Sequence, residues 1–481
     1  MQQDEFALLL LLNNKSLSSA ITRYFAQLEP ASLSQYRLDT DFNPAGSFEI
    51  SMDFMVTDTA IQQWLYSRWP VSNVGVSIAI RVNSNRVEFF VSGDGTNSSS
   101  VSLPLVGNSV WHRLTVVFLS ANTLIIALNG VVASKETTIP APFASPATGY
   151  IGSKDSAERF VDGMIKNPKF KDLSSPVNNQ EYLLGLASSN TEFSLSGNST
   201  LSYLNIAPED RELYEFDNVS TWRNISPPPK LLPALIQPKL LPALIQVAPV
   251  EQEVRDIILL IGQSNMIGRY GPIDPILDAT NTNIKMYGVT LQEVVVAADP
   301  LDHFNEHNGD VGLGLTLAKS YKPASGNEIL LIPSAKGGSG FQDGFWLVGG
   351  AGYNMAVTRS YEATLMGNGT NKVAMIAWHQ GENESSWSEL QYADAIDTLI
   401  NSMRSIIPTA DNAPFIVGEI SPSSNAYGSG VAAALLDTPN RHTKAGYVAT
   451  SDLALGGDNL HFTAASCRTM GERYNAVFES I

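Results

Sequence analysis

The stretch "DIILLIGQSN" (residues 256–265) gives the clearest indication of the fold of the second half of the chain. Its apolar residues follow one another without polar alternation, which is typical of a parallel strand covered on both faces. The run ends at Gly262, and Gln263, Ser264 and Asn265 follow at once. A packed strand normally ends in turn residues, whereas this one ends in a small nucleophile between two amides. The stretch therefore predicts a strand that delivers Ser264 to the edge of a sheet.

Three further apolar runs lack polar alternation: "EILLIPSA" (328–335), "VAMIAWHQG" (373–381) and "APFIVGEI" (413–420). Between and after them lie helical stretches, at roughly 312–321, 351–366, 388–406 and 464–479. Strands and helices in turn predict an α/β/α doubly wound parallel sheet over residues 251–481. In such sheets, sites form at the carboxyl ends of the strands.

The first half of the chain has a different pattern. Short runs such as "FEISMDFMV", "GVSIAIRV", "RVEFFVSG" and "HRLTVVFL" alternate polar and apolar residues, which predicts an antiparallel β-sandwich over residues 31–175. Residues 1–30 form an N-terminal extension, in which "FALLLLL" (6–12) predicts a short helix rather than a signal peptide. Residues 176–250 read as a proline-rich linker that contains the repeat PKLLPALIQ (229–237 and 238–246). The chain is thus predicted to be multidomain.

Charge and cysteine content narrow the choice of partners. The formal net charge of −17 repels phosphate backbones and anionic lipid headgroups, so nucleic acid and membranes are poor partners. A neutral polymer such as a polysaccharide fits this charge better. Cys467 is the single cysteine, so the chain forms no intrachain disulfide and has no cysteine-rich zinc site.

A serine hydroxyl needs a base within hydrogen-bond reach to act as a nucleophile. His461 lies in "GGDNLHFTAASC" (456–467), three residues after Asp458, and this spacing lets a carboxylate orient the imidazole. An acyl-transfer centre also needs donors for the oxyanion. The amide of Ser264, the turn "AKGGSG" (335–340) and the side chain of Gln380 can supply them.

The motifs "GQSNM", "AKGGSG", "WHQGEN" and "DNLHF" resemble, in this order, the SGNH/GDSL hydrolase superfamily, and in particular its sialate O-acetylesterase-like carbohydrate acetylesterase branch. The resemblance covers about residues 254–481 and implies a flavodoxin-like fold without a cofactor or a metal. It implies Ser264 as nucleophile, His461 as base and Asp458 as orienting acid. It also implies the amides of Ser264 and Gly338 and the side chain of Gln380 as oxyanion donors, while leaving open which of Gly337 and Gly338 donates. The branch commonly has Gln, as here, where the wider superfamily has Asn.

The candidates for substrate contact lie within these motifs or in the loop 299–311: Gln263, Asn265, His379, Glu382 and His303. For several residues a structural role competes. The structural alternative for Ser264 is a helix N-cap. The alternative for His379 is a buried histidine at a strand end, and the alternative for Glu382 is a support for the oxyanion loop. "HFNEH" (303–307) matches a zinc-protease pattern, but its position after Pro300 favours a loop at the rim of the site over a metal site.

In the first half, the order "WHRLTVVF" (111–118), "LIIALNGVV" (124–132), "GYIGS" (149–153) and "FVDGMIKNPKF" (160–170) resembles the laminin-G-like and concanavalin A-like sandwich, a jelly-roll of lectin type. That resemblance implies a domain that binds carbohydrate or protein, or acts as a spacer.

Two functional hypotheses follow. The first is a metal-independent serine esterase that removes acetyl groups from a carbohydrate through an acyl-enzyme. The second is a non-catalytic glycan-binding adhesin or tail-fibre protein. A phage tailspike that trims acetylated polysaccharide, with a homotrimeric assembly and an extracellular or virion-associated location, combines features of both. Neither hypothesis identifies the sugar or the acetylated position.

Overall fold

The computed structural model describes residues 20–28, 35–38, 42, 44–68, 77–108, 110–120, 122–144, 149–152, 161, 163–174, 180–182, 191–196, 200–204, 211–217, 221–224, 254–304, 310–323 and 326–481. The chain divides into two compact units, with a boundary between Glu251 and Gln252. The predicted helix at residues 6–12 and the PKLLPALIQ repeat lie outside the described residues.

The first unit is built from antiparallel strands. They are β1 (Ala20–Leu28), β2 (Gln35–Leu38), β3 (Phe48–Val56), β4 (Gln63–Ser67), β5 (Ile78–Asn83), β6 (Arg86–Ser92), β7 (Ser98–Pro104), β8 (His112–Leu119), β9 (Thr123–Leu128), β10 (Val131–Glu136), β11 (Tyr150–Ile151), β12 (Gly163–Asp172), β13 (Gln180–Tyr182), β14 (Thr191–Ser196), β15 (Thr200–Leu204), β16 (Arg211–Asp217) and β17 (Thr221–Asn224). One series of pairings runs β9-β8-β3-β12-β1-β16-β17. A second runs β7-β6-β5-β4-β11-β2-β15-β14.

The two series of strands share one hydrophobic core. Alternate residues of β3, such as Phe48 and Ile50, are buried in the same cluster as Ile80 of β5 and Phe89 of β6. The rings of Phe48 and Phe89 meet edge to face, with centroids 6.1 Å apart. Because a strand presents every second side chain to one face, the polar-apolar alternation of the sequence places these residues between the two sheets. The predicted antiparallel architecture is confirmed.

Two segment assignments differ from the structure. Strand β1 occupies Ala20–Leu28, within the stretch that the sequence assigned to an N-terminal extension, and it pairs with β12 and β16. Strands β13 to β17 lie at residues 180–224, so the prediction of a linker beginning at residue 176 is wrong for these residues. Their runs are only three to seven residues long. Such short runs carry little periodicity, and long-range pairing rather than local pattern stabilises them.

The second unit contains a seven-stranded sheet and its helices. The strands are β18 (Arg255–Gly262), β19 (Ile284–Tyr287), β20 (Val294–Val296), β21 (Glu328–Pro333), β22 (Lys372–His379), β23 (Phe415–Gly418) and β24 (Ala445–Val448), and the helical elements are α2 (Ser264–Ile267), α3 (Gly314–Ser320), α4 (Ala351–Leu365), η5 (Met366–Gly369), η6 (Glu382–Glu384), α5 (Glu389–Ile406), α6 (Ser429–Arg441) and α7 (Ala464–Phe478). The order in the sheet is β20-β19-β21-β18-β22-β23-β24.

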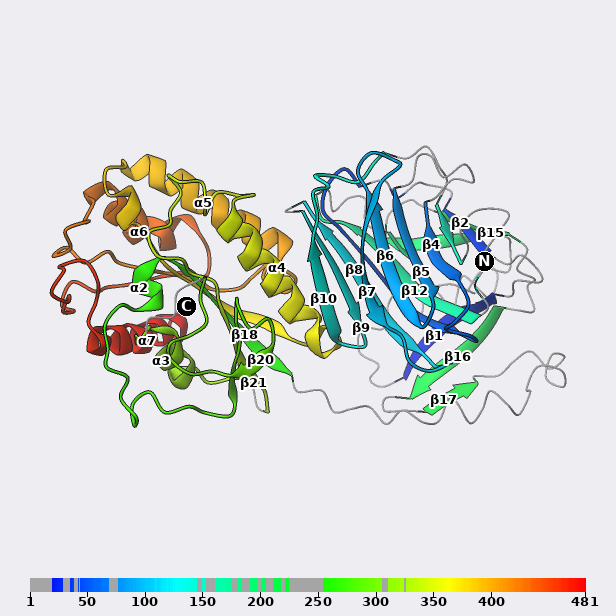
Figure 1. Ribbon diagram of the computed structural model, residues 1–481, viewed down its shortest axis with the longest axis horizontal. Coiled ribbons are helices and arrows are strands. Elements are labelled where there is room, and N and C mark those ends of the chain that lie inside the picture. Colours follow the sequence, from blue (N-terminus) through cyan, green and yellow to red (C-terminus); the bar gives the residue numbers. More distant parts are fainter. Residues whose placement is uncertain are drawn as a thin grey trace, which may run out of the picture. The chain divides into compact units, whose positions relative to one another are not determined.

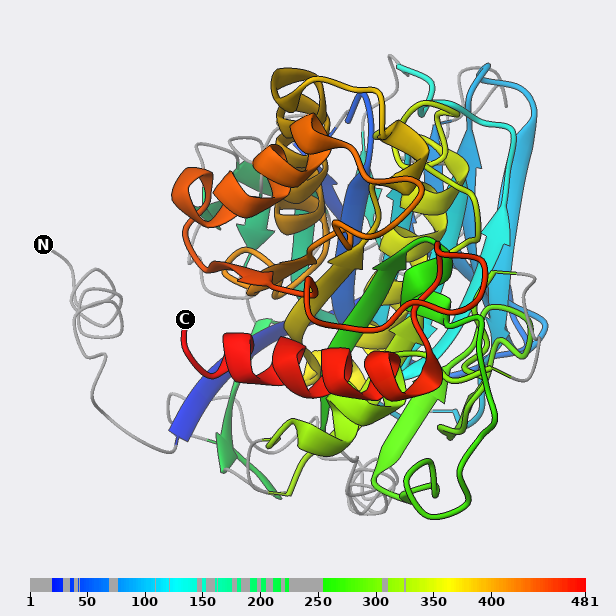
Figure 2. The same ribbon diagram turned by 90° about the vertical axis from the view of Figure 1, so that its left-hand side faces the viewer.

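This sheet is mixed rather than purely parallel. All neighbouring pairs run parallel except β19 and β20, which pair antiparallel at one edge. Helices α3 and α7 lie on one side of the sheet, and α4, α5 and α6 lie on the other (Figures 1 and 2). The four predicted helices are confirmed. Helix α6 was missed, because it begins with Ser429 and Gly430 and contains Pro439, which weaken the helical pattern.

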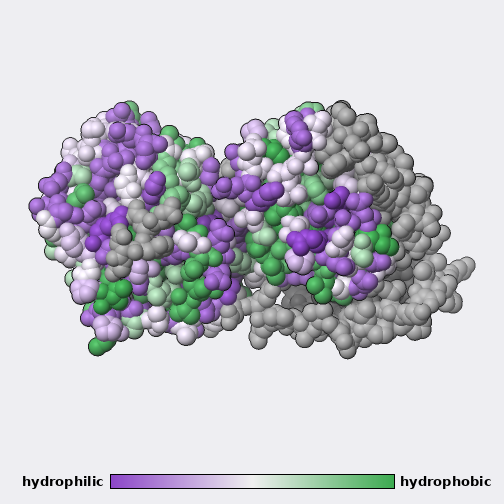
Figure 3. Space-filling model, viewed as in Figure 1, coloured by the Kyte–Doolittle hydropathy of each residue, from purple (hydrophilic) through white to green (hydrophobic). Residues whose placement is uncertain are grey.

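The surface of the second unit shows no single extended apolar area on the face drawn in Figure 3, where polar and apolar side chains are interspersed. Exposed apolar side chains such as Ile276 and Leu436 are scattered among different elements, which is ordinary for a folded domain. None of the helices in the described part of the chain combines the length and apolar character that a bilayer crossing requires.

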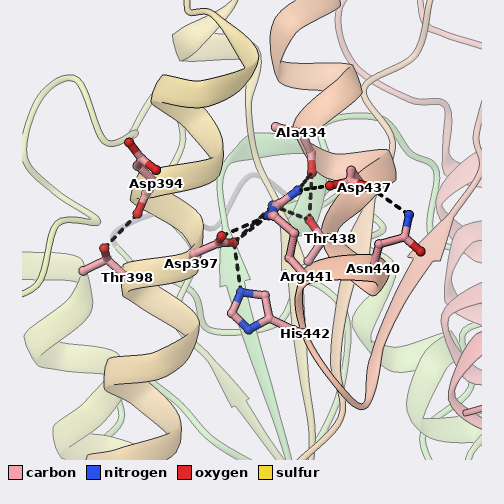
Figure 4. A network of polar contacts seen from close by, with 9 residues as sticks. All are labelled: Asp394, Asp397, Thr398, Ala434, Asp437, Thr438, Asn440, Arg441 and His442. Carbon is pink, nitrogen blue, oxygen red and sulfur yellow. Dashed lines mark hydrogen bonds and ion pairs between the residues drawn. The ribbon is translucent and has the colours of Figure 1, made fainter.

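An ion-pair network joins α5 to the C-terminal end of α6 (Figure 4). Arg441 Nε donates to both carboxylate oxygens of Asp397, at 3.1 and 2.9 Å, and its Nη1 donates to Asp437 at 3.1 Å. His442 Nε2 lies 2.9 Å from Asp397 Oδ1. Asp397 therefore pairs with Arg441, the last residue of α6, and lies beside the ring of the C-cap residue His442.

We predict that Asp397→Ala destabilises the second unit. The change leaves the half-buried Arg441 guanidinium without its bidentate partner, and after allowance for solvent screening we expect a loss of about 1–2 kcal/mol. Thermal unfolding should show the transition of this unit lowered by about 2–8 °C.

Asp394→Ala is the matched control for this prediction. Asp394 is exposed on the same helix, and only its backbone oxygen accepts a hydrogen bond, from Thr398. Equal melting temperatures for the two variants would contradict a structural role for the Asp397 network.

Candidate active site

The ends of two neighbouring strands approach each other at Gly262 and His379. The backbone of Gly262 has φ +131°, and a Cβ added there would lie 2.1 Å from the carbonyl oxygen of His379. Only glycine accepts both this conformation and this contact. The amide of Gln263 then donates to the same carbonyl at 2.9 Å. The chain therefore turns into α2 directly beside the end of β22.

Ser264, His461 and Asp458 form a continuous row of hydrogen bonds. His461 Nε2 lies 2.9 Å from Ser264 Oγ, and its Nδ1 lies 2.6 Å from Asp458 Oδ2. With the Nδ1 proton directed to the carboxylate, Nε2 can accept the serine proton. Ser264 is the first residue of α2 and Gln263 is its N-cap, so the alternative of Ser264 as a helix N-cap is wrong.

Local hydrogen bonds hold Asp458 in its ionised form. Partial burial raises the pKa of this carboxyl. The amide and the imidazole of His461 and the amide of Leu460 donate to it and outweigh that effect, so the pKa is lowered to about 2. A charged acceptor for the His461 ring is thus present throughout the neutral pH range.

Asn265 clamps the loop that carries His461. Its Nδ2 donates to the carbonyl of Leu460 at 3.2 Å, and its Oδ1 accepts from the amide of Phe462 at 3.1 Å. The same Nδ2 donates to Glu382 Oε1 at 2.5 Å. Burial raises the pKa of Glu382, and the hydrogen bond from Asn265 opposes that rise. Both residues were predicted to contact substrate; in the structure Asn265 holds the residues on either side of His461, and Glu382 holds Asn265.

Two backbone amides, at the start of α2 and in the glycine-rich turn 335–340, have no internal acceptor. The N–H groups of Ser264 and Gly338 make no hydrogen bond to any described residue. Gly338 is exposed, has φ +66°, and a Cβ built there would meet nothing within 4 Å. Unpaired amides beside a nucleophile can stabilise negative charge that develops on a carbonyl oxygen.

Gln380 has a different environment from the one the sequence predicts. It is completely buried, and its Nε2 donates to Gln263 Oε1 at 3.0 Å, to the carbonyl of Ser339 at 3.3 Å and to Glu384 Oε2. Its own backbone and side-chain oxygens accept from Tyr392. The amino group of Gln380 thus has only internal partners, all of them protein acceptors.

His379 is also completely buried. Its Nδ1 donates to Tyr474 Oη at 3.1 Å, while the tyrosine donates to the carbonyl of Trp378 at 2.7 Å. Burial lowers the pKa of His379 to about 4. Its ring packs edge to face on Phe462. Because no part of its side chain is exposed, His379 has the position of the buried histidine that the sequence offered as an alternative to substrate contact.

His303 holds the beginning of the glycine-rich turn 335–340. It is 1% exposed, and its Nδ1 accepts from the amide of Ala335 at 3.1 Å. Its partner in the zinc-protease pattern, His307, lies outside the described residues. Among the described side chains, no group of three or more His, Cys, Asp and Glu residues is arranged to hold a metal ion.

Several residues of this site were missed by the sequence reasoning. The hydroxyl of Tyr270 accepts from the amide of Asp458 at 3.3 Å, and Asn425 donates to the carbonyl of Asp458 at 3.1 Å. Gln380 is hydrogen-bonded to Tyr392 and Glu384, and His379 is hydrogen-bonded to Tyr474. Glu384 follows the "WHQGEN" motif directly and was within reach of the sequence reasoning. No local pattern marks the other four.

Comparison with known families identifies the region that contains this site. Residues 254–480 match the family of carbohydrate esterases described as sialic acid-specific acetylesterases. This region, which we call the esterase region after the family that it matches, holds every residue of the hydrogen-bonded row. The expected resemblance to carbohydrate acetylesterases is confirmed.

Solved structures also resemble parts of the chain. A protein from Arabidopsis thaliana is 26% identical, with a TM-score of 0.42 and coverage of 47% of this chain and 98% of its own. NanS is 17% identical, with a TM-score of 0.40 and coverage of 48% and 98%. Domains LG4-5 of the mouse laminin α1 chain are 14% identical, with a TM-score of 0.27 and coverage of 38% and 46%. A comparison with curated protein sequences found no match.

We predict that His379 makes the esterase region less stable in acid. Its pKa is about 6.5 when unfolded and about 4 in the fold, so between these values the unfolded chain binds more protons. The stability that depends on the neutral ring is complete above pH 6.5 and is lost as the pH falls towards 4. The loss amounts to on the order of 2–3 kcal/mol by pH 4.5.

Urea unfolding of wild type and His379→Asn at pH 7.5 and pH 4.5 measures this contribution. The difference in unfolding free energy between the two pH values should be smaller in the variant by that amount. Equal differences would show that the titration of His379 is not coupled to folding.

Proposed function

We propose that the esterase region is a serine-dependent carbohydrate O-acetylesterase with an SGNH-type fold. The observation that carries the proposal is the row Ser264–His461–Asp458, in which both ring nitrogens of one histidine have partners at 2.9 and 2.6 Å. The match of residues 254–480 to a carbohydrate esterase family supports the same chemistry. The proposed substrate is an acetylated carbohydrate or polysaccharide.

In the proposed reaction, Ser264 Oγ attacks the carbonyl carbon of the acetyl ester while His461 Nε2 takes the hydroxyl proton. The π electrons of the carbonyl move to its oxygen, where the amides of Ser264 and Gly338 stabilise the charge. Collapse of the intermediate breaks the bond to the sugar oxygen, which receives the proton from His461. Water then attacks the acetyl-serine with His461 as base, and releases acetate and free Ser264.

The first unit would serve the esterase region by binding the polymer. Its antiparallel sheets match the sequence resemblance to lectin-type sandwiches, and carbohydrate binding is our proposal for it.

We predict that Ser264→Ala abolishes hydrolysis of p-nitrophenyl acetate. The alanine variant has no nucleophile, and the loss of a triad serine in hydrolases lowers kcat by about 10⁶-fold. Ser405→Ala is the control, since Ser405 is an exposed serine on α5 outside the site. Hydrolysis by Ser264→Ala at the wild-type rate would exclude Ser264 as the nucleophile.

We also predict that the wild-type protein releases acetate from an O-acetylated polysaccharide. NMR of free acetate, measured over a panel of acetylated polysaccharides, identifies the substrate and the position that is cleaved. Binding to such a polymer without acetate release, by a protein that is active on p-nitrophenyl acetate, would favour the non-catalytic adhesin as the biological role.

A further inference from the structure

Tyr427 differs from the other aromatic residues of the esterase region by its exposure. It is 41% exposed, whereas every other Phe, Tyr and Trp among the described residues of this region is buried or only half-buried. Aromatic residues near the glycine-rich turn, such as Phe341 and Trp346, pack against the buried Trp378, with ring centroids 5.5 and 5.4 Å apart. Those rings belong to the core, so Tyr427 is the aromatic ring that is open to a ligand.

Tyr427 lies on a loop that is hydrogen-bonded to the loop with the proposed base. The loop 421–428 follows β23, whose carboxyl end is at the same edge of the sheet as that of the parallel strand β22. The amide of Asn425 donates to the carbonyl of Asn459 at 2.9 Å, and its Nδ2 donates to the carbonyl of Asp458 at 3.1 Å. Two residues of chain span at most about 7 Å, so the backbone of Tyr427 is close to this attachment.

The attachment is at the outer end of the hydrogen-bonded row. Ser264 is 5% exposed, while the side chains of His461 and Asp458 are 17% and 40% exposed. The row therefore runs from a buried nucleophile to a carboxylate at the surface. A loop that is bound to the surface end contacts those parts of a ligand that extend beyond the ester group.

The Tyr427 phenol also lies near the edge strand β24. Burial raises the pKa of Tyr447 in this strand, and the carboxyl of Glu419 and the phenol of Tyr427 add to the rise. Tyr427 is thus close both to the loop with the proposed base and to the edge of the sheet. This position, outside the row, suits a sugar unit that follows the acetylated one.

The backbone around Tyr427 is held in place. Its amide donates to the carbonyl of Ser424 at 3.1 Å, and the amide of Ala426 donates to Ser424 Oγ at 3.1 Å. Gly428 packs so closely that a Cβ built there would lie 2.3 Å from the carbonyl oxygen of Ser385. A ligand that binds to a loop already held in this way has little loop entropy to remove.

We propose that Tyr427 is a specificity-determining residue whose ring stacks on the sugar unit next to the acetylated one. One face of a pyranose ring presents C–H bonds with partial positive charge on hydrogen, and the face of an aromatic ring is negative. Stacking also removes apolar surface of both rings from water, while the phenol and the sugar hydroxyls stay hydrated. The inference rests on the proposed esterase function and extends it, because the preferred substrate is then a sugar chain and not a free monosaccharide.

Kinetics of the full-length protein on esters with and without a second sugar test this inference. The probes are p-nitrophenyl acetate, O-acetylated xylan, O-acetylated polysialic acid and the acetylated monosaccharide of each polymer. We expect wild type to have a higher kcat/KM on at least one polymer than on its monosaccharide. In Tyr427→Ala, KM for that polymer should rise about tenfold more than KM for p-nitrophenyl acetate. Tyr427→Phe retains the ring and should keep most of the polymer preference.

Leu436→Ala is the matched control, because it removes an exposed apolar side chain from α6. This variant should keep the wild-type ratio of the two KM values. Equal rises of KM for polymer and p-nitrophenyl acetate in Tyr427→Ala, or an equal loss of preference in Tyr427→Phe, overturn the stacking role. Wild-type hydrolysis of p-nitrophenyl acetate without a preference for either polymer overturns this inference alone. No hydrolysis of any probe by wild type overturns the proposed function itself.

Discussion

The contact between the backbones at Gly262 and His379 is the constraint on which the site depends. Two parallel strands end side by side, and their chains come so close that a single Cβ at residue 262 would lie 2.1 Å from a carbonyl oxygen. Gly262 pairs with His379 in the sheet, so Ser264 and Gln380, which follow these strand ends, leave the sheet at the same edge. The other parts of the site, including the loop with His461, contact residues at or directly after these two strand ends.

Around this pair of strand ends, buried polar groups hold the residues of the site in place. Asn265 binds the residues on both sides of His461, and Glu382 binds Asn265. Glu384 binds Gln380 in the same way. Burial raises the pKa of both carboxyls, and the hydrogen bonds that they accept counter this effect. A buried polar group is tolerated when it is hydrogen-bonded, and it then fixes the geometry of its partner.

The two units show how the same physical rule produces opposite patterns. Strands of the first unit have one face in the shared core, so polar and apolar residues alternate. Strand β18 of the second unit is buried on both faces by helices on the two sides of the sheet, and residues Asp256 to Gly262 are all buried. Sequence periodicity reports how many faces of a strand are covered. The short strands at residues 180–224 escaped prediction because three to seven residues hold too few periods to reveal this.

Local patterns in the sequence predict the strands with strong periodicity, four of the helices, and the proximity of Asp458 to His461. These features depend on contacts within a few residues, and local chemistry therefore marks them. Only the tertiary structure brings Ser264 to His461, which lies 197 positions further along the chain. It also places Tyr474 and Tyr392 as supports of the strand ends. Contacts between residues so far apart in the sequence depend on how the whole chain packs, so no local pattern encodes them.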